Sequence, residues 1–329
     1  MTLNFFLPES DAVHATLPGS IADYWAWQGQ ATLSTPYWGR YHWVLQTYLY
    51  LKEAGAAVVL VNTMPAAGVI VTHIDCVEYG FKPTAQQFFI ALLVDRETAH
   101  PRADLHVLHN PVQRLHLGLK HCYMPPWPQI GLIPRDDARA DRFAVLGYFG
   151  YPNNQHSSLS APSFLKKIEA LGLRMYVPAA AEWHDFSGVD CIMAIRDLGR
   201  TKGHLNKPSL KLLNAWIAGV PAILGYELAY RAEGQPNVGY LEATSADEVL
   251  DVLSVLQSDV QRRRSIVEYG RHAAKAYEIS KTVERWRVLL AKAVLAAQAK
   301  GASGPIRRLE NRSIGALRER VLWRRPGWF

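Results

Sequence analysis

What this chain lacks excludes several classes of protein. Its 329 residues include three cysteines, Cys76, Cys122 and Cys191, which form neither a CxxC pair nor a pattern with histidine at metal-ligand spacing. This usage is not that of a disulfide-rich secreted domain, and it indicates a reducing compartment. The longest apolar runs are far shorter than the ~20 residues that span a bilayer, and the N-terminal residues do not read as a signal peptide. We therefore expect a cytoplasmic protein without a transmembrane anchor.

The sequence also lacks internal repeats, low-complexity segments and two familiar motifs. No GxGxxG follows the first apolar run of either half, which disfavours a dinucleotide-dependent enzyme such as a nucleotide-sugar epimerase. No DxD sequence lies in a plausible metal-binding loop. We therefore expect neither a bound catalytic metal nor a cofactor.

What is present is the composition of a globular protein with a local excess of positive charge. Apolar residues make up 49% of the chain, and its length exceeds the size at which one core usually keeps growing, so two domains are expected. The net charge is +7, and residues 301–329 supply most of it with seven arginines against two glutamates. The remainder is nearly balanced. An anionic partner is favoured, but a broad nucleic-acid-binding face is not.

The N-terminal half alternates short β-rich runs with a helical stretch, which is the pattern of parallel α/β architecture. A long aromatic loop is predicted after the first run, followed by a helix over residues 39–53 that Gly55 ends. The predicted strands are residues 3–8, 56–62, 68–73, 88–95 and 104–110.

A proline-rich stretch, residues 123–142, interrupts this alternation with four prolines and a burst of charge. We take residues 126–142 as a linker between an N-terminal domain, residues 1–125, and a C-terminal domain, residues 143–300. The C-terminal domain repeats the alternation, with predicted strands at 143–150, 173–178, 190–195 and 221–225 and helices near 160–171, 207–218 and after 245. The prediction is an α/β fold of two Rossmann-like domains facing a cleft.

The most informative stretch, residues 206–231, combines a predicted helix start with positive charge. Pro208 suits the first turn of a helix and Gly219 suits its end. Apolar residues at helical spacing leave another face for Lys207, Lys211 and Asn214. Free amides, the helix dipole and two ammonium groups would together suit a diphosphate. An ordinary solvated basic helix start is the alternative.

This stretch resembles the donor-binding region of GT-B glycosyltransferases. The order KPSLKLLNAW, AGVPAILG, YELAYR looks like that of bacterial and cyanobacterial members, and weaker matches at LHVLHNP, WPQIGLIPRD and EWHDFSGVD extend the resemblance over most of residues 68–275. The resemblance implies an enzyme that moves a sugar from a nucleotide-diphosphate sugar, bound by the C-terminal domain, to a glycan or lipid-linked acceptor bound by the N-terminal domain.

The resemblance also implies roles for individual residues. Lys207 and Lys211 would supply charge to the phosphates, and Ser209 would donate a hydrogen bond to a phosphate or the ribose. Glu227 would accept hydroxyl hydrogen bonds, unless it only stabilises a helix dipole, and Gly150 would allow close approach of phosphate, unless it only shapes a turn. The predicted donor-binding residues are Arg196, Arg200, Asn206, Lys207, Ser209, Lys211, Asn214, Glu227 and Gly150.

One departure from the family pattern bears on the mechanism. Many retaining members carry two glutamates eight positions apart around this helix start, and the matching positions here are Asn206 and Asn214. Asparagine supplies no carboxylate charge, so inversion is favoured. A nucleotide- or sugar-binding protein of the same fold without catalysis is the alternative.

An inverting transfer needs a general base for the acceptor hydroxyl, and it is expected from the N-terminal domain. Four residues follow predicted strands there: Asp11 and His14 after the first, and His73 and Asp75 after the third. His73 with Asp75 is the first choice because a nearby carboxylate raises the basicity of an imidazole. A structural histidine is the alternative at either place.

Two aromatic regions suggest further contacts. Trp25, Trp27 and Trp38 lie in the predicted loop 23–43 and would stack on acceptor sugar rings, with core packing as the alternative. The tail, residues 311–329, combines arginines with large apolar residues and indicates peripheral contact with the inner membrane face. A helix that packs back across the domains is the alternative.

Overall fold

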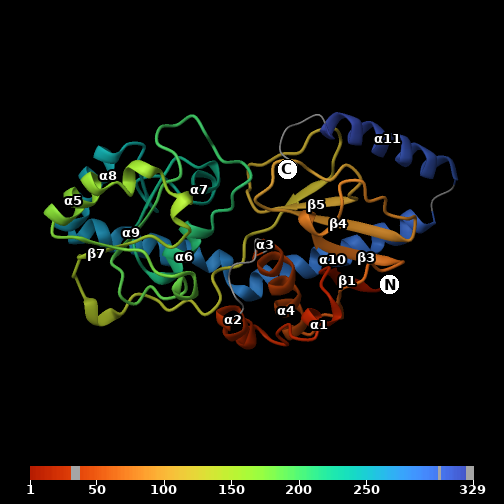
Figure 1. The fold of residues 1–329 in the computed structure, drawn as a ribbon, viewed down its shortest axis with the longest axis horizontal. Helices are drawn as coiled ribbons and strands as arrows, with labels where there is room; N and C mark the ends of the chain where they lie inside the picture. The colour runs from red at the N-terminus through yellow and green to blue at the C-terminus, as the bar shows by residue number, and fades with distance from the viewer. Residues whose placement is uncertain (31–37, 303–304, 324–329) are drawn as a thin grey trace. The chain divides into compact units, whose positions relative to one another are not determined.

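The computed structural model describes residues 1–30, 38–302 and 305–323, and the chain divides into two compact units (Figure 1). Unit 1 comprises Met1–Pro125, Asn206–Pro208 and Ile279–Phe329, and unit 2 comprises Pro126–Leu205 and Ser209–Glu278. Unit 1 is therefore assembled from three separate stretches of sequence, one of which is only three residues long.

Unit 1 is built on a six-stranded parallel sheet in the order β2-β1-β3-β4-β5-β6. Its strands are β1 (Leu3–Phe6), β2 (Val58–Val61), β3 (Gly68–His73), β4 (Gln87–Leu93), β5 (Leu105–Leu108) and β6 (His121–Tyr123). β3 and β4 are buried along their whole length, which explains why they read as continuous apolar runs. The five strands predicted in this half are confirmed, whereas β6 was missed because it is a half-buried edge strand of mixed polarity.

The predicted aromatic loop of unit 1 is wrong over much of its length. Ser10 accepts a hydrogen bond from the amide of Val13 and caps a short helix, and Ser20 accepts one from the amide of Asp23 at the start of a longer helix. The predicted helix 39–53 is confirmed, with a π-helical turn in its first half. The elements are α1 (Asp11–His14), α2 (Ile21–Gln30), α3 (Trp38–Arg40), η1 (Tyr41–Leu45), α4 (Gln46–Glu53) and η2 (Ile74–Cys76).

The C-terminal helices α10 (Ile279–Gly301) and α11 (Pro305–Trp323) complete unit 1. α10 packs against β3, β4 and α4 (Figure 1). Its buried residues, among them Trp286 and Leu290, recur at helical spacing and form the apolar face that covers the sheet.

Unit 2 is built on a five-stranded parallel sheet in the order β11-β10-β9-β7-β8. Its strands are β7 (Val145–Gly147), β8 (Arg174–Tyr176), β9 (Cys191–Ala194), β10 (Ala222–Leu224) and β11 (Leu241–Glu242). Its helices are η3 (Asp137–Arg139), η4 (Pro152–Asn154), η5 (Ser157–Leu159), α5 (Pro162–Ala170), η6 (Ala180–Glu182), α6 (Leu210–Ala218), α7 (Leu228–Glu233), α8 (Ala246–Ser258), α9 (Val260–Ala274) and η7 (Lys275–Tyr277). The four strands predicted in this half are confirmed.

Apolar clusters cover both faces of the sheet in unit 2. Ile192 and Ala194 of β9 belong to one cluster with residues of α6, whereas Cys191 and Met193 belong to another with residues of α5 and α8. Successive residues of a strand point to opposite faces, so helices lie on both sides of this sheet. The predicted α/β class with two Rossmann-like halves is confirmed by these two parallel sheets.

The strand order reverses once in each sheet. In unit 2 the chain goes from β7 to β8 on one side and then to β9 on the other, and in unit 1 it goes from β1 to β2 and then to β3. Open α/β sheets bind ligands outside the carboxyl ends of the strands at such a point. The segments that follow β7 and β9, and those that follow β1 and β3, are therefore the places to search for functional residues.

Candidate functional site

In unit 2, the segment that follows β7 meets the first turn of α6. Lys211 Nζ donates a hydrogen bond to the carbonyl oxygen of Phe149 and lies 5.2 Å from the ring centroid of Tyr148. A Cβ atom at Gly150 would lie 2.8 Å from Lys211 Nζ. Only glycine therefore fits at this position while the ammonium group stays in place.

The environment of Lys211 lowers its affinity for a proton. Burial is the largest cause, the positive charge of Arg196 adds to it, and the carboxylate of Glu227 opposes both, with the result that the pKa of Lys211 falls to about 7. A bound anion would favour the protonated form. Lys211 is therefore a cation whose charge depends on pH near neutrality and on what binds beside it.

Arg196 and Glu227 form a second pair at the same edge of the sheet, because they follow β9 and β10. Arg196 Nε lies 3.1 Å from Glu227 Oε1, and Glu227 is 1% exposed. Arg200 lies elsewhere: it pairs with Glu242 at 3.4 Å, and its side chain is 64% exposed. The structure thus brings Arg196, Glu227, Lys211 and Gly150 to one edge, whereas Arg200 pairs with Glu242 of β11, whose side chain is 2% exposed.

Ser209 occupies the N-cap position of α6 but makes no side-chain cap hydrogen bond. The residue is fully buried, and among the described residues its hydroxyl has no hydrogen-bond partner. A buried hydroxyl without a partner costs about 1–3 kcal/mol. The Ser209 hydroxyl therefore has unused hydrogen-bonding capacity beside the first turn of α6.

Asn214, one turn further along α6, has a structural contact. Its Oδ1 accepts a hydrogen bond of 3.0 Å from the amide of Gln129. The residue is 8% exposed. The carbonyl oxygen of Asn214 therefore holds the proline-rich segment within unit 2.

The predicted start of the helix at Lys207 is wrong, because α6 begins at Leu210. The three preceding residues belong to unit 1. The amide of Asp95 donates to the carbonyl oxygen of Asn206 at 3.1 Å, Lys207 Nζ lies 3.0 Å from Asp95 Oδ1, and Asn110 Nδ2 donates to the carbonyl oxygen of Lys207 at 3.1 Å. These contacts hold the segment out of the helix. Lys207 and Lys211 therefore do not share a helical face.

In unit 1, His73 ends β3 and both of its ring nitrogens are engaged. His73 Nε2 lies 3.1 Å from the carbonyl oxygen of Val94, and Nδ1 accepts a hydrogen bond of 3.2 Å from the amide of Asp75. This requires the neutral tautomer with the proton on Nε2, and burial lowers the pKa of His73. Asp75 Oδ2 lies 3.6 Å from His73 Nδ1 and 2.6 Å from Arg96 Nη2. The carboxylate thus bonds most closely to the arginine.

Asp11 and His14 lie on α1, which follows β1 at the reversal of strand order. Asp11 is exposed, and its Oδ1 accepts a hydrogen bond of 2.7 Å from Asn62 Nδ2. His14 is half-buried, and its Nε2 has no hydrogen-bond partner among the described residues. Asp11 is the more accessible of the two.

The tryptophans predicted to bind the acceptor differ in their surroundings. The ring centroid of Trp27 lies 5.8 Å from that of Tyr24 and 5.2 Å from that of Tyr41, so this side chain takes part in aromatic packing. Trp25 is half-buried on α2. Trp38 begins α3, and its side chain is outside what the structure describes, as are residues 31–37.

A second group of residues at the edge of unit 1 was missed by sequence reasoning. Asp95 follows β4 with a positive φ of 57° and pairs with Lys207. His109 follows β5 and stacks on Trp43, with ring centroids 4.7 Å apart. Burial lowers the pKa of His42 and of His109 to about 4. The signal was available, since Asp95 is the last residue of the predicted strand 88–95 and His109 lies near the end of the predicted strand 104–110.

The helix α11 packs onto unit 1. Leu322 belongs to an apolar cluster with Leu119 and other buried residues, and the guanidinium of Arg318 donates to the carbonyl oxygens of Leu117 and Gly118. Among the side chains of α11 that the structure describes, those of Ile314, Leu317 and Val321 are exposed. The end of the predicted tail, residues 324–329, and the side chain of Trp323 lie outside the description.

Nowhere in residues 1–30, 38–302 and 305–323 do three or more histidine, cysteine, aspartate or glutamate side chains gather as a metal site would require. Within the same ranges no helix has the length and apolar character needed to cross a membrane.

Comparison with known proteins gives similarity in structure only. No protein-family model matches the chain, and no curated protein is similar to it in sequence. The structure is similar to sucrose-phosphate synthase from Thermosynechococcus elongatus, with a TM-score of 0.48 and 13% identity over 69% of this chain and 74% of that one. It is similar to HepE from Anabaena in complex with UDP, with a TM-score of 0.47 and 12% identity over 74% of this chain and 88% of that one. It is also similar to AviGT4, a glycosyltransferase involved in avilamycin A biosynthesis, with a TM-score of 0.49 and 17% identity over 77% of this chain and 89% of that one.

Proposed function

We propose that this chain is a glycosyltransferase that uses a nucleotide-diphosphate sugar. The observation that carries the proposal is the carboxyl edge of the sheet in unit 2, where the strand order reverses between β7 and β9. There Lys211, whose pKa falls to about 7, lies so close to Gly150 that a side chain at position 150 would meet its ammonium group. This arrangement suits a diphosphate better than it suits a neutral ligand.

The donor would use four groups at this edge. The diphosphate would lie at the first turn of α6, where Lys211 supplies charge and the Ser209 hydroxyl finds the partner that it lacks. Arg196 would add a second cation, and Glu227 would accept hydrogen bonds from ribose or sugar hydroxyls. Glu227 is buried and held by Arg196, so its position is fixed before a ligand arrives.

The transfer would invert the anomeric carbon without a metal ion. A base removes the proton of the acceptor hydroxyl as its oxygen attacks the anomeric carbon, and the bond to the diphosphate oxygen breaks with its electron pair leaving on the nucleotide. The dipole of α6 and the charges of Lys211 and Arg196 would stabilise the departing diphosphate.

Among the four predicted candidates for the base, the geometry favours Asp11. His73 can accept a proton on Nδ1 only by giving up the hydrogen bond from the amide of Asp75, and its burial disfavours the charged form. Asp11 is exposed and follows β1 at the reversal of strand order. We propose Asp11 as the base, with His14 beside it on α1, and a structural role for His73 and Asp75.

The donor proposal is tested by binding of nucleoside diphosphates. UDP, GDP, ADP and CDP are screened by thermal shift, because a ligand of the folded state raises the unfolding temperature. Lys211→Met keeps most of the apolar stem and removes the charge, so the affinity for the best ligand should fall about tenfold or more. Lys166→Met, which removes an exposed lysine of α5, is the matched control. Equal affinity of Lys211→Met and the unchanged protein would remove the basis of the proposal.

The base is tested by comparing variants of the two candidate sites in a transfer assay. Asp11→Asn should lower the transfer rate by about 10²–10⁴-fold with unchanged donor affinity. His73→Asn should instead lower the unfolding temperature and leave the transfer rate of the folded protein within a few fold. Full activity in Asp11→Asn, together with loss in His73→Asn, would return the base to His73.

A nucleotide- or sugar-binding protein without catalysis is the second candidate, and one observation favours it. The position of Asn214, where retaining relatives carry a glutamate, is occupied by an amide whose oxygen binds the chain at Gln129. Release of free nucleotide from the donor, with or without an acceptor, separates the two candidates, since mere binding releases none.

We also propose a cytoplasmic protein that contacts the inner membrane face through α11. The exposed side chains of Ile314, Leu317 and Val321 recur at helical spacing, and the surrounding sequence is rich in arginine. Such contact would suit an acceptor carried on a lipid. Leu317→Asp should reduce sedimentation with anionic vesicles, while Val255→Asp, at an exposed apolar residue of α8, should leave it unchanged.

A further inference from the structure

Unit 2 contains a pocket of about 690 Å³ at the amino ends of its strands. Arg142 lies three residues before β7, Asp190 comes directly before β9, and Pro221 comes directly before β10, and all three line the pocket. Lys211 and Arg196 belong to the carboxyl edge of the same sheet. The pocket is therefore separate from the proposed donor site.

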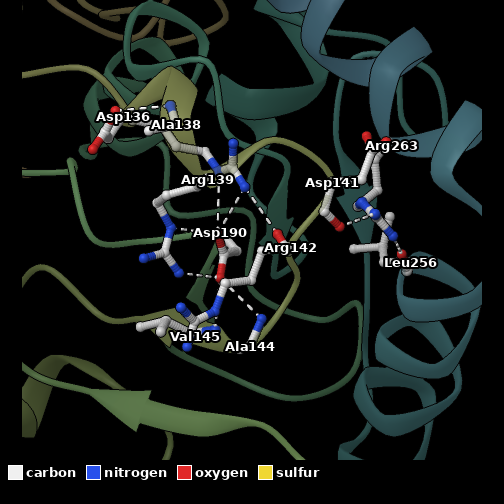
Figure 2. Close-up of polar contacts among 11 residues, drawn as sticks. Asp136, Ala138, Arg139, Asp141, Arg142, Ala144, Val145, Asp190, Leu256 and Arg263 are labelled. Atoms are coloured by element: carbon white, nitrogen blue, oxygen red, sulfur yellow. Dashed lines mark hydrogen bonds and ion pairs between the residues drawn. The ribbon is translucent and has the colours of Figure 1, made fainter.

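One wall of the pocket is built around a buried carboxylate. Asp190 accepts hydrogen bonds from the guanidinium groups of Arg135 and Arg139, at 2.9 and 2.6 Å for the shorter contacts, and from the amides of Ala144 and Val145 (Figure 2). One carboxylate thus pairs with two guanidinium groups, so these three side chains together carry a net positive charge. The network also fixes the segment that leads into β7.

The opposite wall is one face of α9 and its continuation. Lining residues recur there at positions 264, 268, 271 and 275, three or four residues apart. Arg263 lies on the same face, and its guanidinium donates to the carbonyl oxygens of Leu256 and Asp141 (Figure 2). It also donates to the carbonyl oxygen of Gln257. Its charge is therefore stabilised by carbonyl dipoles, and no carboxylate within the described residues pairs with it.

The lining as a whole is cationic. Six arginine or lysine side chains and four carboxylates line the pocket, which leaves an excess of two positive charges before His272 is counted. Asp141 pairs with Arg264 at 2.8 Å, and Asp190 is shared as described above. Two of the four carboxylates are thus already engaged by arginine.

Arg142 and Arg271 are the groups with capacity for a ligand. Both are exposed, and neither guanidinium has an ion pair or a hydrogen bond within the described part of the chain. Gly219, which ends α6 with a positive φ of 71°, lets Arg271 approach closely, because a Cβ atom there would lie 3.1 Å from Arg271 Nη2. Two unpaired guanidinium groups thus line one cavity from segments that are far apart in sequence.

We propose that this pocket binds a compact ligand with clustered phosphate groups. Guanidinium groups match phosphate oxygens in pairs, and the volume lies in the range of about 300–1,000 Å³ of small-molecule sites. The ligand is either a free oligophosphate or the phosphate headgroup of a lipid, and both present the same chemistry to the arginines.

The test measures binding of inorganic pyrophosphate to the full-length protein by isothermal titration calorimetry. Arg142→Ser/Arg271→Ser removes the two unpaired charges, and the loss of two charge-assisted contacts should weaken binding at this pocket about tenfold or more. Lys166→Ser/Lys167→Ser removes two exposed charges from α5 and is the charge-matched control. Lys211→Met shows whether a binding event belongs to the donor site.

A second arm distinguishes the two sources of phosphate. Sedimentation is measured with phosphatidylcholine vesicles that contain or lack phosphatidic acid, with every variant also carrying Leu317→Asp so that the proposed contact through α11 does not contribute. Vesicle binding that needs phosphatidic acid and is lost in the double arginine variant, but not in the lysine control, assigns the pocket to a lipid headgroup. Pyrophosphate binding with the same dependence on the variants, without vesicle binding, assigns it to a free oligophosphate.

The proposal fails if the double arginine variant binds both probes as the unchanged protein does. It also fails if the unchanged protein binds neither probe, or if only Lys211→Met reduces pyrophosphate binding. Because these outcomes do not depend on sugar transfer, they are independent of the proposed function. Thermal unfolding without ligand checks that the variants are folded.

Discussion

The two units share an architecture but bury different polar groups. All four histidines that the described residues bury, His73, His100, His106 and His109, lie in unit 1. Unit 2 instead buries three carboxylate side chains, Asp190, Glu227 and Glu242, each with an arginine beside it. The buried polar groups around the parallel sheet are thus neutral imidazoles in unit 1 and ion pairs in unit 2.

This difference predicts how each unit responds to pH. Burial lowers the pKa of His100 and His109 to about 4 and of His106 to about 3, so these groups take up protons only when unit 1 unfolds. Burial also raises the pKa of the Asp190 carboxyl, but hydrogen bonds from Arg139, Arg135 and two amides outweigh it and the net pKa is lowered. The histidines weaken unit 1 below pH ~6.5, whereas Asp190 stabilises unit 2 until the pH falls below ~4.

The largest effect is expected from breaking the ion pairs of unit 2. Asp190→Asn leaves two guanidinium groups without their carboxylate, and it should reduce the free energy of unfolding of unit 2 by about 3–5 kcal/mol. Urea denaturation, with hydrogen exchange of β9 peptides to assign the change to unit 2, measures it. Asp137→Asn, an exposed carboxylate nearby, should change stability by less than about 0.5 kcal/mol. A loss below 1 kcal/mol in Asp190→Asn would show that the two units are not held by different means.

A smaller effect is expected from acid. As the pH falls from ~6.5 to 4.5, each buried neutral histidine should lower the free energy of unfolding of unit 1 by up to roughly 2.5 kcal/mol. Hydrogen exchange, corrected for the intrinsic rate at each pH, should therefore rise first in peptides of β3 and β4 and later in those of β9 and β10. His106→Gln keeps a donor for the carbonyl oxygen of Lys120 and should move the acid midpoint of unit 1 to lower pH. Simultaneous loss of both units would contradict the comparison.

The smallest effect is expected on ligand affinity at Lys211 of unit 2. Burial lowers the pKa of this lysine, as it lowers the pKa of the buried histidines of unit 1. With a pKa of about 7, its charge is lost as the pH rises, so the affinity for a nucleoside diphosphate should fall about fivefold between pH 7 and 8. The terminal phosphate, with a pKa of about 6, is already ionised in this range. Calorimetry at several pH values measures the slope, and Lys211→Met should abolish it. The same slope in the variant would assign the titration to another group.

Most strands were predictable from sequence because each is a short apolar run ended by glycine, proline or a polar residue. The run that became β4 is buried at every position and leaves little choice of structure. The misses have local causes. β6 alternates poorly and is only half-buried, and α2 was hidden by its aromatic residues, although Ser20 and Asp23 form an ordinary cap.

The site was predictable where a residue is marked by the strand or helix next to it in the sequence. Gly150 was found at the end of the predicted strand 143–150, and Arg196 was found because it follows the predicted strand 190–195. The position of Lys207 outside the helix was not predicted. Its contacts with Asp95 and Asn110, about a hundred positions away in the sequence, hold it out of α6. The pocket at the amino edge gave no sequence signal, since it joins Arg142 to Arg271 across most of unit 2.

During synthesis unit 2 is completed before unit 1, because unit 1 includes the C-terminal helices. All residues of unit 2 are present once Glu278 has been added to the chain, whereas unit 1 still lacks α10 at that point. Trp286 and its buried neighbours on that helix cover the sheet of unit 1, so the first-made strands stay uncovered while the ribosome completes the rest. A fragment that stops at Glu278 should therefore expose the apolar face of β3 and β4 and require a chaperone, although nothing in unit 2 is missing.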